Sequence, residues 1–491
     1  MADASSLPAS VRAEPIPGAG TGLVATQPIP AAREIFTIKA PLIAIADDAH
    51  LAETCAHCLA WKPTSAVPGY YSSSDGPPLL QCAGCKTLKY CSQACQRASW
   101  RHIHKSECKI FTRLYPRVLP ASVRALVRLL LLEPTLPPKT WESIINLQHH
   151  TPEFQASPKH AEIQLMSKGA HAYSGTSLPE ALVQRLYCTL LVNTLTLTTP
   201  TLDPIGLYFD PLPSTINHSC NANTFITFSG ASLTLRSLRP ITEGEELTLP
   251  YVDTTLATSH RLSTLRERWF FTCRCPLCTS SPNIPQDQLQ CPSCQTPGLP
   301  PLCTHCNAAI PHRPDSEELR VLYKAGNMPA TRQPIPSLHA AAVQSFLSDA
   351  NYEAALRHQL LLVTRIYPRL YPQPHHPLRV ASGFVLAALL IEVSHSPGGT
   401  LAPLRVDWGK ALWAVLVQVE AGVSGCHGAE SAFAALVRQK KAEVKDELEK
   451  AGVGWVKEVE KGCKIPELDE EMRKVQAVVD GLVAELKGET V

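Results

Sequence analysis

Residues 217–253, NHSCNANTFITFSGASLTLRSLRPITEGEELTLPYVD, are the stretch that decides the fold. Apolar and polar residues alternate in TFITF and SLTLRSL, which predicts two short strands. EGEE predicts a turn, and LTLPY predicts a further strand whose pairing ends or becomes an edge at Pro250. The opening NHSC sets a cysteine beside an asparagine and a histidine. A small core thiol is one explanation for Cys220, so the rest of the chain has to decide what this group does.

The composition of the whole chain is that of an ordinary globular protein. It has 491 residues, of which 45% are hydrophobic and 18% charged, and this length suggests about three domains. A net charge of +2 gives no electrostatic footprint for bulk nucleic-acid binding. The N-terminus has no apolar signal core, and the longest apolar run, 380–393, is short for a bilayer and has helical spacing. We therefore expect a soluble intracellular protein with no membrane partner.

The eighteen cysteines predict metal sites rather than disulfides, because intracellular thiols are kept reduced. The first group contains seven cysteines and one histidine in four short pairs, which make two complete sets of four tetrahedral zinc ligands. Pairs at helical spacing in YCSQACQRASWRHIHKSEC bring both ligands to one face. The members of this group are Cys55, Cys58, Cys82, Cys85, Cys91, Cys95, His104 and Cys108.

Two further groups follow. FFTCRCPLC supplies Cys273, Cys275 and Cys278, and Cys220 of NHSC is the natural fourth ligand. The last group has the spacing of a small zinc ribbon, although a loop in which only some of its cysteines bind, or none, fits as well. Its members are Cys291, Cys294, Cys303 and Cys306. The remaining thiols, expected to carry no chemistry, are Cys188, Cys426 and Cys463.

In their order along the chain, these motifs resemble the SET and MYND domain (SMYD) family of protein lysine methyltransferases. NHSC followed by GEELTLPYVD resembles the core of a SET domain, FFTCRCPLC resembles the post-SET zinc loop, and the first cysteine group resembles a MYND finger. The resemblance implies an α+β fold, in which a split SET domain holds an inserted MYND zinc finger and is followed by a post-SET loop and an α-helical, TPR-like C-terminal domain. The implied segments are the N-terminal SET part 8–50, the finger 55–108, a helical insert 109–200, the SET core 201–255, the post-SET loop 256–280, the ribbon 287–310 and the helical domain 315–491.

The resemblance also implies how the finger binds its two ions. One ion takes Cys55, Cys58, Cys91 and Cys95, and the other takes Cys82, Cys85, His104 and Cys108. Three residues separate Trp100 from His104, where the family more often has two, so His102 is an alternative ligand. A loop rich in Pro, Gly and Ser at 62–78 is expected to be a mobile insertion. With the ribbon, the chain would hold four zinc ions, and without it three.

The remaining site residues come from the same resemblance. GAGTG at 18–22 resembles the turn whose backbone approaches S-adenosylmethionine (AdoMet), which missing Cβ atoms permit. Tyr251 resembles the catalytic tyrosine and Trp269 an aromatic wall of the lysine channel. The residues implied to hold the cofactor are Gly20, Thr21, Gly22, Asn193, Asn217, His218 and Phe271.

The implied chemistry is an in-line displacement of a methyl group by a neutral lysine amine. It needs alignment and a water-poor channel rather than a strong nucleophile, and burial in the channel eases loss of the lysine proton. His218 is then a cofactor-binding residue rather than a general base, and the zinc ions are structural. The expected substrate is a protein lysine, histone or non-histone.

Two other functions compete with this one. An inactive SET scaffold, whose finger binds proline-rich peptides, is favoured by Pro250 before Tyr251 and by Ala222, where the family often has proline. A DNA-binding zinc protein would need a basic face, for which WRHIHK is the only candidate, so we expect no sequence-specific nucleic acid. We expect a monomer in the nucleus, the cytoplasm or both. Apolar residues three and four apart predict amphipathic helices in the C-terminal region, with a mixed-charge helix pair at its end.

Overall fold

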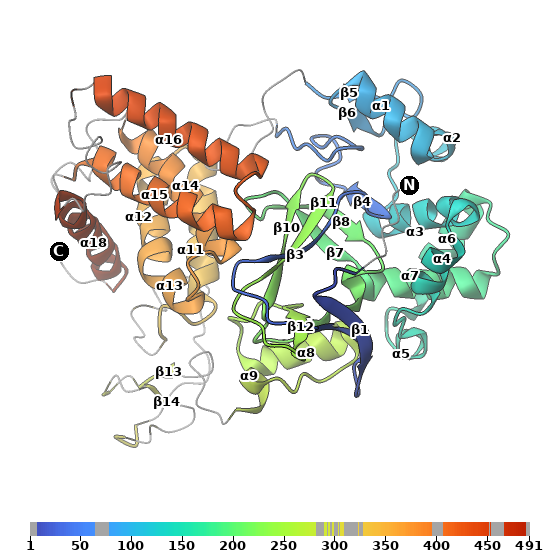
Figure 1. The fold of residues 1–491 in the computed structure, drawn as a ribbon, viewed down its shortest axis with the longest axis horizontal. Coiled ribbons are helices and arrows are strands. Elements are labelled where there is room, and N and C mark those ends of the chain that lie inside the picture. The colour runs from blue at the N-terminus through green and yellow to red at the C-terminus, as the bar shows by residue number, and fades with distance from the viewer. Residues whose placement is uncertain are drawn as a thin grey trace. The chain divides into compact units, whose positions relative to one another are not determined.

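The computed structural model has the predicted α+β fold, with helices and small sheets in one unit and helices in another (Figure 1). The first unit runs mainly to residue 251 and includes 264–272; the second takes 252–263 and the chain from 273. The described residues are 7–63, 78–280, 289–291, 293–294, 297–298, 303, 305–308, 323, 328–394, 406–450, 452 and 466–487. The predicted mobile loop at 62–78 and Cys463 therefore fall almost wholly outside the described residues.

Outside the two-stranded sheet β5-β6 at residues 80–90, three small sheets form the β part of the first unit, with strand orders β1-β2-β12-β9, β10-β11-β3 and β4-β8-β7. The expected strands at TFITF, SLTLRSL and LTLPY are confirmed as β10, β11 and β12. The strands are β1 (Val11–Ile16), β2 (Gly20–Ala25), β3 (Glu34–Ile38), β4 (Ile43–Ala46), β7 (Leu195–Thr198), β8 (Pro204–Phe209), β9 (Asn217–His218), β10 (Thr224–Ser229), β11 (Ser232–Ser237) and β12 (Glu246–Leu249).

One pairing between these strands positions the site. All other ladders in the three sheets are antiparallel, but β9 pairs with β12 in parallel, with Thr248 opposite Asn217 and Leu249 opposite His218. The apolar faces beneath this pairing form a core that includes Leu23, Ile216 and Leu247, each at most 1% exposed. NHSC is therefore held directly beside the strand that leads into Tyr251.

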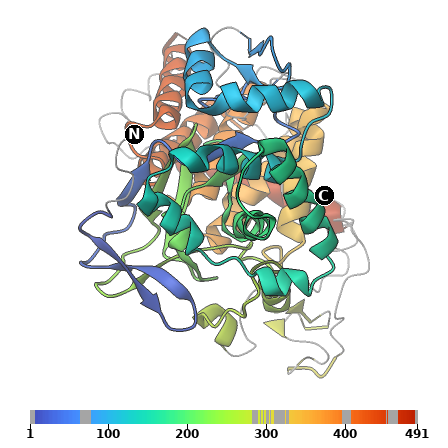
Figure 2. The same cartoon turned by 90° about the vertical axis from the view of Figure 1, so that its right-hand side faces the viewer.

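The finger and the helical insert share one core. Leu88 and Tyr90 of the finger pack in the same cluster as the apolar face of α3 (Ala121–Leu132) and as β4. Figure 2 shows the finger helices above those of the insert. The finger has β5 (Leu80–Gln81), β6 (Lys89–Tyr90), α1 (Gln93–Ser99), the π-helical turn η1 (Trp100–His104) and α2 (Lys105–Leu114). The insert has α3 (Ala121–Leu132), η2 (Glu133–Thr135), α4 (Pro138–Ile145), α5 (Thr151–Gln155), α6 (His160–Ser174) and α7 (Glu180–Asn193).

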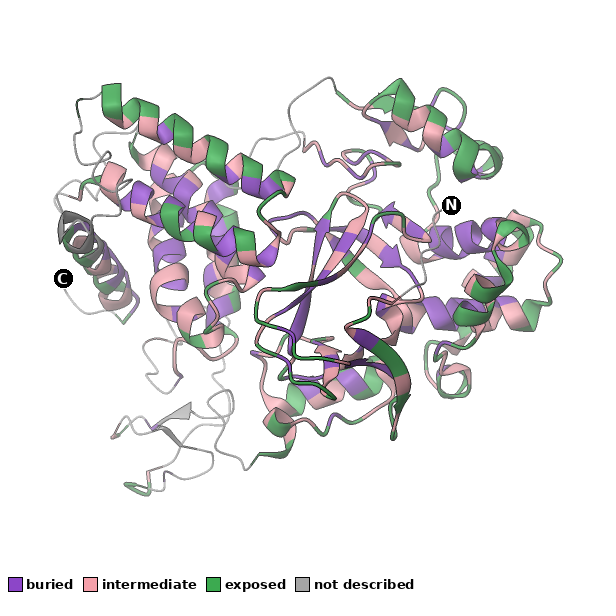
Figure 3. Ribbon diagram, viewed as in Figure 1, coloured by how far each residue is buried: buried purple, intermediate pink, exposed green. Residues whose placement is uncertain are grey.

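The C-terminal helices from α11 to α16 pack consecutively, and α18 packs against α12 and α15. Figure 3 shows the buried faces of α11 to α16 turned toward one another. Among the described residues, α14 (Pro377–Ser394) alone is long and apolar enough to cross a membrane by length and composition, and half of it is buried within the protein. The helices are α11 (Ile335–Ser348), α12 (Tyr352–Leu361), η4 (Leu362–Ile366), α13 (Tyr367–Leu370), α14 (Pro377–Ser394), α15 (Trp408–Cys426), α16 (Ala432–Lys450) and α18 (Pro466–Lys487).

Short elements connect these parts. A 3-10 turn, η3 (Pro213–Thr215), leads into β9, and α8 (Thr258–Trp269) follows β12. α9 (Pro276–Thr279) lies in the FFTCRCPLC motif, and β13 (Leu289–Gln290) pairs with β14 (Pro297–Gly298) within the predicted ribbon. The seven segment boundaries drawn from the sequence stay predictions.

Gly206 tests the contact between β4 and β8. A Cβ atom at this position would lie 2.0 Å from the carbonyl oxygen of Ile45, and that backbone atom cannot move without breaking the ladder. We expect Gly206→Ala to lower the free energy of unfolding by about 3 kcal/mol, at the upper end of overpacking costs. Denaturant unfolding measures this change. Gly169→Ala in α6 is the matched control, because its Cβ meets only ordinary contact at 3.8 Å and should be neutral or stabilising. Equal stability of the two variants would contradict the contact.

Candidate active site and metal clusters

The predicted metal ligands gather into four clusters, in each of which the ligand atoms lie within 4.8 Å of one another. The first finger cluster is Cys55, Cys58, Cys91 and Cys95, and the second finger cluster is Cys82, Cys85, His104 and Cys108. The Cys220 cluster is Cys220, Cys273, Cys275 and Cys278, and the ribbon cluster is Cys291, Cys294, Cys303 and Cys306. Each cluster has the number and kind of ligands that a structural zinc ion takes.

The spacing inside the clusters also fits zinc. A tetrahedron with zinc–sulfur bonds of about 2.3 Å has sulfur–sulfur edges of about 3.8 Å. The sulfurs of Cys58 and Cys91 are 3.6 Å apart, and those of Cys82 and Cys108 are 3.9 Å apart. The ribbon cluster has corresponding distances of 3.4 and 3.6 Å. All cysteines of the described residues are free thiols, so no disulfide competes with metal binding there.

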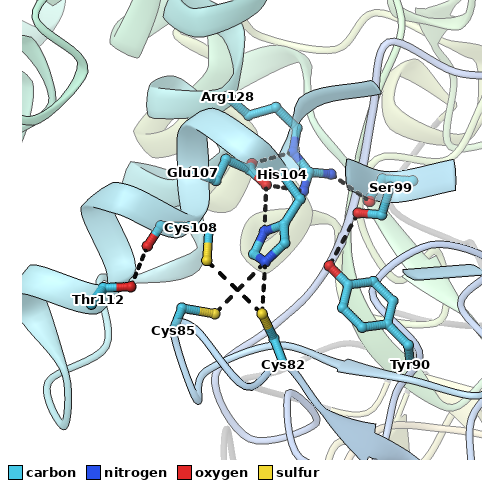
Figure 4. A network of polar contacts seen from close by, with 10 residues as sticks. Cys82, Cys85, Tyr90, Ser99, His104, Glu107, Cys108, Thr112 and Arg128 are labelled. Carbon is cyan, nitrogen blue, oxygen red and sulfur yellow. Dashed lines mark hydrogen bonds and ion pairs between the residues drawn. The ribbon is translucent and has the colours of Figure 1, made fainter. Parts of the chain in front are cut away.

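His104 rather than His102 belongs to the second finger cluster. The Nε2 atom of His104 lies 3.4 Å from the sulfur of Cys82 and 3.7 Å from that of Cys85, and the side chain is fully buried, whereas His102 is exposed (Figure 4). The extra residue after Trp100 is accommodated by the π-helical turn η1. Such a turn holds one residue more than an α-helical turn, so it returns His104 to the face that carries Cys108.

The glycine turn and Asn217 form the first half of the candidate active site. The amide Nδ2 of Asn217 donates to Glu246 Oε1 at 2.8 Å and lies 3.4 Å from the carbonyl oxygen of Thr21. A Cβ on Gly22 would lie 2.6 Å from that same Glu246 oxygen and 3.0 Å from the Asn217 amide. Gly22 therefore keeps open the space in which Asn217 is held. Gly20 has a φ of +78°, a left-handed backbone conformation that residues with a Cβ atom rarely adopt.

His218 is locked by both of its ring nitrogens. The backbone N–H of Tyr251 donates to His218 Nδ1 at 2.9 Å, so Nδ1 is an acceptor and the ring proton sits on Nε2. Nε2 lies 3.3 Å from the sulfur of Cys220 and donates toward it. Nδ1 also lies 3.2 Å from the carbonyl oxygen of Leu249, but this contact is not a hydrogen bond because both atoms are acceptors. With neither nitrogen free, His218 is unsuited to act as a general base.

Tyr251 anchors the aromatic half of the site. Its hydroxyl donates to the carbonyl oxygen of Ile216 at 2.5 Å, and its ring lies 5.2 Å from that of His218 and 5.3 Å from that of Trp269. Burial raises the pKa of Tyr251 well above its ordinary value, and the charge of Glu246 raises it further. The phenol therefore stays protonated at neutral pH and can only donate or accept a hydrogen bond.

The end of α8 supplies the remaining aromatic side chains. Trp269 donates its indole N–H to the carbonyl oxygen of Val192 at 3.0 Å, and the guanidinium of Arg268 stacks 4.4 Å from its ring. Phe270 follows with a φ of +58° and packs against Phe154 in the insert, at 4.8 Å between ring centroids. This turn of the backbone brings Phe271 to 5.9 Å from the ring of His218. Trp269 and Phe271 thus lie on the same side of the site as Tyr251.

Asn193 stands at the edge of this arrangement. Its amide donates to the carbonyl oxygens of Gln148 at 2.7 Å and Thr189 at 2.8 Å, so it fastens the loop after α4 to α7. The Nε2 atom of that Gln148 lies 3.2 Å from where a Cβ of Gly20 would be. Thr21 is exposed and contributes its backbone carbonyl. The roles of Asn193 and Thr21 toward a cofactor stay predictions, as do those of the other site residues.

Sequence reasoning missed three side chains that shape these sites. Glu246 was assigned only to a turn, yet it holds the Asn217 amide. Gln148 sits in the insert with no motif around it. Arg128 of α3 contacts Glu107 beside the second finger cluster. The one available signal for Arg128 was its position on an otherwise apolar helix face. Charged residues are rarely buried without a partner, so this position indicates a buried ion pair.

Comparisons with known proteins agree with the resemblance to SET and MYND domain proteins seen in the sequence motifs. The model of the SET domain family matches residues 20–252. The chain is 35% identical over 266 residues to SET domain and MYND-type zinc finger protein 6 of Schizosaccharomyces pombe, covering 54% of this chain and 50% of that protein. It is 32% identical over 209 residues to histone-lysine N-methyltransferase SMYD3 of Homo sapiens, covering 41% of this chain and 49% of that protein. The matches therefore span about half the length of these relatives.

A solved structure of the SET domain of LSMT, bound to lysine and AdoHcy, aligns with 90% of this chain and 88% of its own at 12% identity. The TM-score of that alignment is 0.23, which is too low to support an argument. The family model and the two curated relatives confirm the resemblance to SET and MYND domain proteins.

The ribbon cluster yields a prediction about metal content. We expect the purified chain to hold four zinc ions, and we expect the double variant Cys303→Ser, Cys306→Ser to hold three, because two ligands do not retain zinc at neutral pH. Elemental analysis of gel-filtered protein measures the ratio. Cys188→Ala is the matched control, since this buried thiol lies outside all four clusters. An unchanged zinc content in the double variant would show that the ribbon cluster holds no ion.

Proposed function

We propose that this SET and MYND domain protein is an S-adenosylmethionine-dependent protein-lysine N-methyltransferase. The observation that carries the proposal is the convergence of distant segments on one place in the first unit. Asn217 and the glycine turn meet on one side, and the rings of Tyr251, Trp269 and Phe271 meet near His218. The name of human SMYD3, a histone-lysine N-methyltransferase, supports the same reaction class.

The residues present fit the cofactor. Gly22 lacks the Cβ that would crowd Glu246 and Asn217, and Asn217 has its amide oriented by Glu246 before a ligand arrives. When bound, AdoMet supplies an electrophilic methyl group on a sulfonium sulfur. Asn217, His218 and the backbone at Gly20–Gly22 would hold it, with Phe271 against its adenine. Prior orientation of these groups matters, because an already ordered site loses less entropy when the ligand binds.

The aromatic residues serve the lysine. The rings of Tyr251 and Trp269 pack against each other with centroids 5.3 Å apart, and together they would form one wall of a lysine channel that excludes water and disfavours the charged ammonium form. The Tyr251 hydroxyl, fixed on the carbonyl oxygen of Ile216, orients the amine together with nearby carbonyl oxygens. AdoMet would supply the methyl group that the neutral lysine amine accepts, and the Tyr251 hydroxyl would keep that amine aligned with it.

The substrate proposed is a lysine-bearing protein, histone or non-histone, modified in the nucleus, the cytoplasm or both. We further propose that the finger can engage a proline-rich peptide, with the protein acting as a monomer. An inactive scaffold with that peptide-binding role is the competing function, and a measurement of AdoMet binding separates the two.

Calorimetry of AdoMet binding tests the proposal first. We expect wild type to bind and Asn217→Ala to bind about 10- to 100-fold more weakly, the range for losing one or two hydrogen bonds to a charged ligand. Tyr251→Phe should bind within about threefold of wild type, yet transfer methyl groups to lysine peptides about 100-fold more slowly. Absence of AdoMet binding by well-folded, zinc-loaded wild type would overturn the proposal in favour of the peptide-binding scaffold.

The raised pKa of Tyr251 gives a prediction for the dependence on pH. Its phenol stays protonated across the range in which the substrate lysine loses its proton, so methyl transfer should rise with pH up to about pH 10 without a falling limb. Single-turnover rates between pH 7 and 10 measure this profile. Tyr251→Phe should give the same shape at a lower rate. A falling limb in wild type that vanishes in the Phe variant would mean that Tyr251 titrates in this range.

A further inference from the structure

A buried ion pair between Arg128 and Glu107 lies beside the second finger cluster (Figure 4). The Nε atom of Arg128 donates to Glu107 Oε1 at 2.7 Å and its Nη2 atom donates to Oε2 at 3.1 Å, which is the two-pronged geometry of a strong Arg–carboxylate pair. Glu107 is 2% exposed and Arg128 is 9% exposed. Charges this well buried require a reason beyond stability, because desolvation offsets most of what the pair gains.

The ring of His104 suggests that reason. Its Nε2 atom faces the cluster sulfurs, so the proton of the neutral ring must sit on Nδ1. Nδ1 is buried with no hydrogen-bond partner, yet it lies 3.6 Å from Glu107 Oε2. This separation is just beyond hydrogen-bond range, and a movement of a few tenths of an ångström would close it.

We propose that Glu107 and Arg128 are positioning residues for the metal of the second finger cluster. Glu107 accepts a hydrogen bond from the Nδ1–H of His104 and so fixes the tautomer and orientation that present Nε2 to zinc. Arg128 holds the Glu107 carboxylate in place through its two hydrogen bonds. Carboxylates that accept from a metal-bound histidine typically change metal affinity 10- to 100-fold.

The pair also joins the metal to the body of the first unit. Arg128 belongs to α3 of the insert, and its Nη1 atom donates to the carbonyl oxygen of Ala44 in β4 at 3.3 Å. A chain of polar contacts therefore runs from the cluster through Glu107 to the insert and a sheet. All four ligands of this cluster are buried, whereas three of the four in the first finger cluster are only partly so.

Arg124 provides a matched control on the same helix, one turn earlier. It is 4% exposed, and it donates to the carbonyl oxygens of Leu119 and Ala46 and to Asp48 at 2.7 Å. It therefore resembles Arg128 in its own burial and in having a carboxylate partner, but that partner, Asp48, is 56% exposed and is not next to a metal ligand.

The experiment measures zinc affinity site by site on the full chain. Protein is held in buffers of defined free zinc and alkylated, and mass spectrometry reports which cysteines are protected. In Arg128→Met, we expect a 10- to 100-fold rise in the free zinc concentration at which half of the protein is protected from alkylation at Cys82, Cys85 and Cys108. Protection of the first finger cluster should stay within about twofold of wild type. In Arg124→Met, both clusters should behave as in wild type.

Removing Arg128 alone leaves a buried unpaired carboxylate, so a second pair of variants guards against misfolding. Glu107→Leu with Arg128→Met removes both charges and should fold, while still showing the weakened second cluster. Arg128→Lys keeps the charge without the two-pronged geometry and should recover part of the affinity. Equal protection of the second cluster in the Arg128 and Arg124 variants would overturn the proposal, as would an equal loss at both finger clusters in Arg128→Met.

Discussion

The parallel pairing of Asn217 and His218 with Thr248 and Leu249 is the constraint on which the candidate site depends. It is only two residues long, so it would be weak by itself, and its neighbours reinforce it. Ser219 donates its N–H to the carbonyl oxygen of Leu249, Tyr251 donates its N–H to the His218 ring, and the Tyr251 hydroxyl returns to Ile216. Each contact ties the segment before the pairing to the segment after it. A shift of one residue would exchange the faces of Asn217 and His218 and separate the cofactor side from the aromatic side.

Metal ligands set the second constraint, and they act over longer separations in the sequence. Each cluster collects side chains from at least two segments, so one ion can hold segments that share little apolar surface. Cys220 is both such a ligand and the acceptor of the His218 ring proton. The orientation of His218 is therefore linked to the chemistry at a metal cluster as well as to the sheet. This link explains why Asn, His and Cys occur side by side in NHSC.

The metal-ligand groups and several strands could be predicted from the sequence, because cysteine spacing and strand alternation are local patterns. The cysteine groups followed from spacing, whereas the division of the finger ligands between two ions came from the family resemblance. The strands at TFITF and SLTLRSL followed from period-two alternation. The choice between His102 and His104 could not be made, because it depends on a π-helical turn that propensities do not encode. Glu246 and Arg128 were missed because their roles arise from partners far along the chain, Asn217 and Glu107, and neither lies in a recognisable motif.

The order of the strands has a consequence for how the protein is made. β2, β3 and β4 precede residue 47, but their partners β12, β11 and β8 begin only at residue 204. A ribosome adding about 5–20 residues per second needs roughly ten to thirty seconds for the intervening stretch of about 160 residues. During that interval β3 and β4 have no partner and β2 has only β1, while the ligands of both finger clusters, at 55–108, are already complete. Synthesis therefore favours a finger that loads its metal before the sheets around it can close.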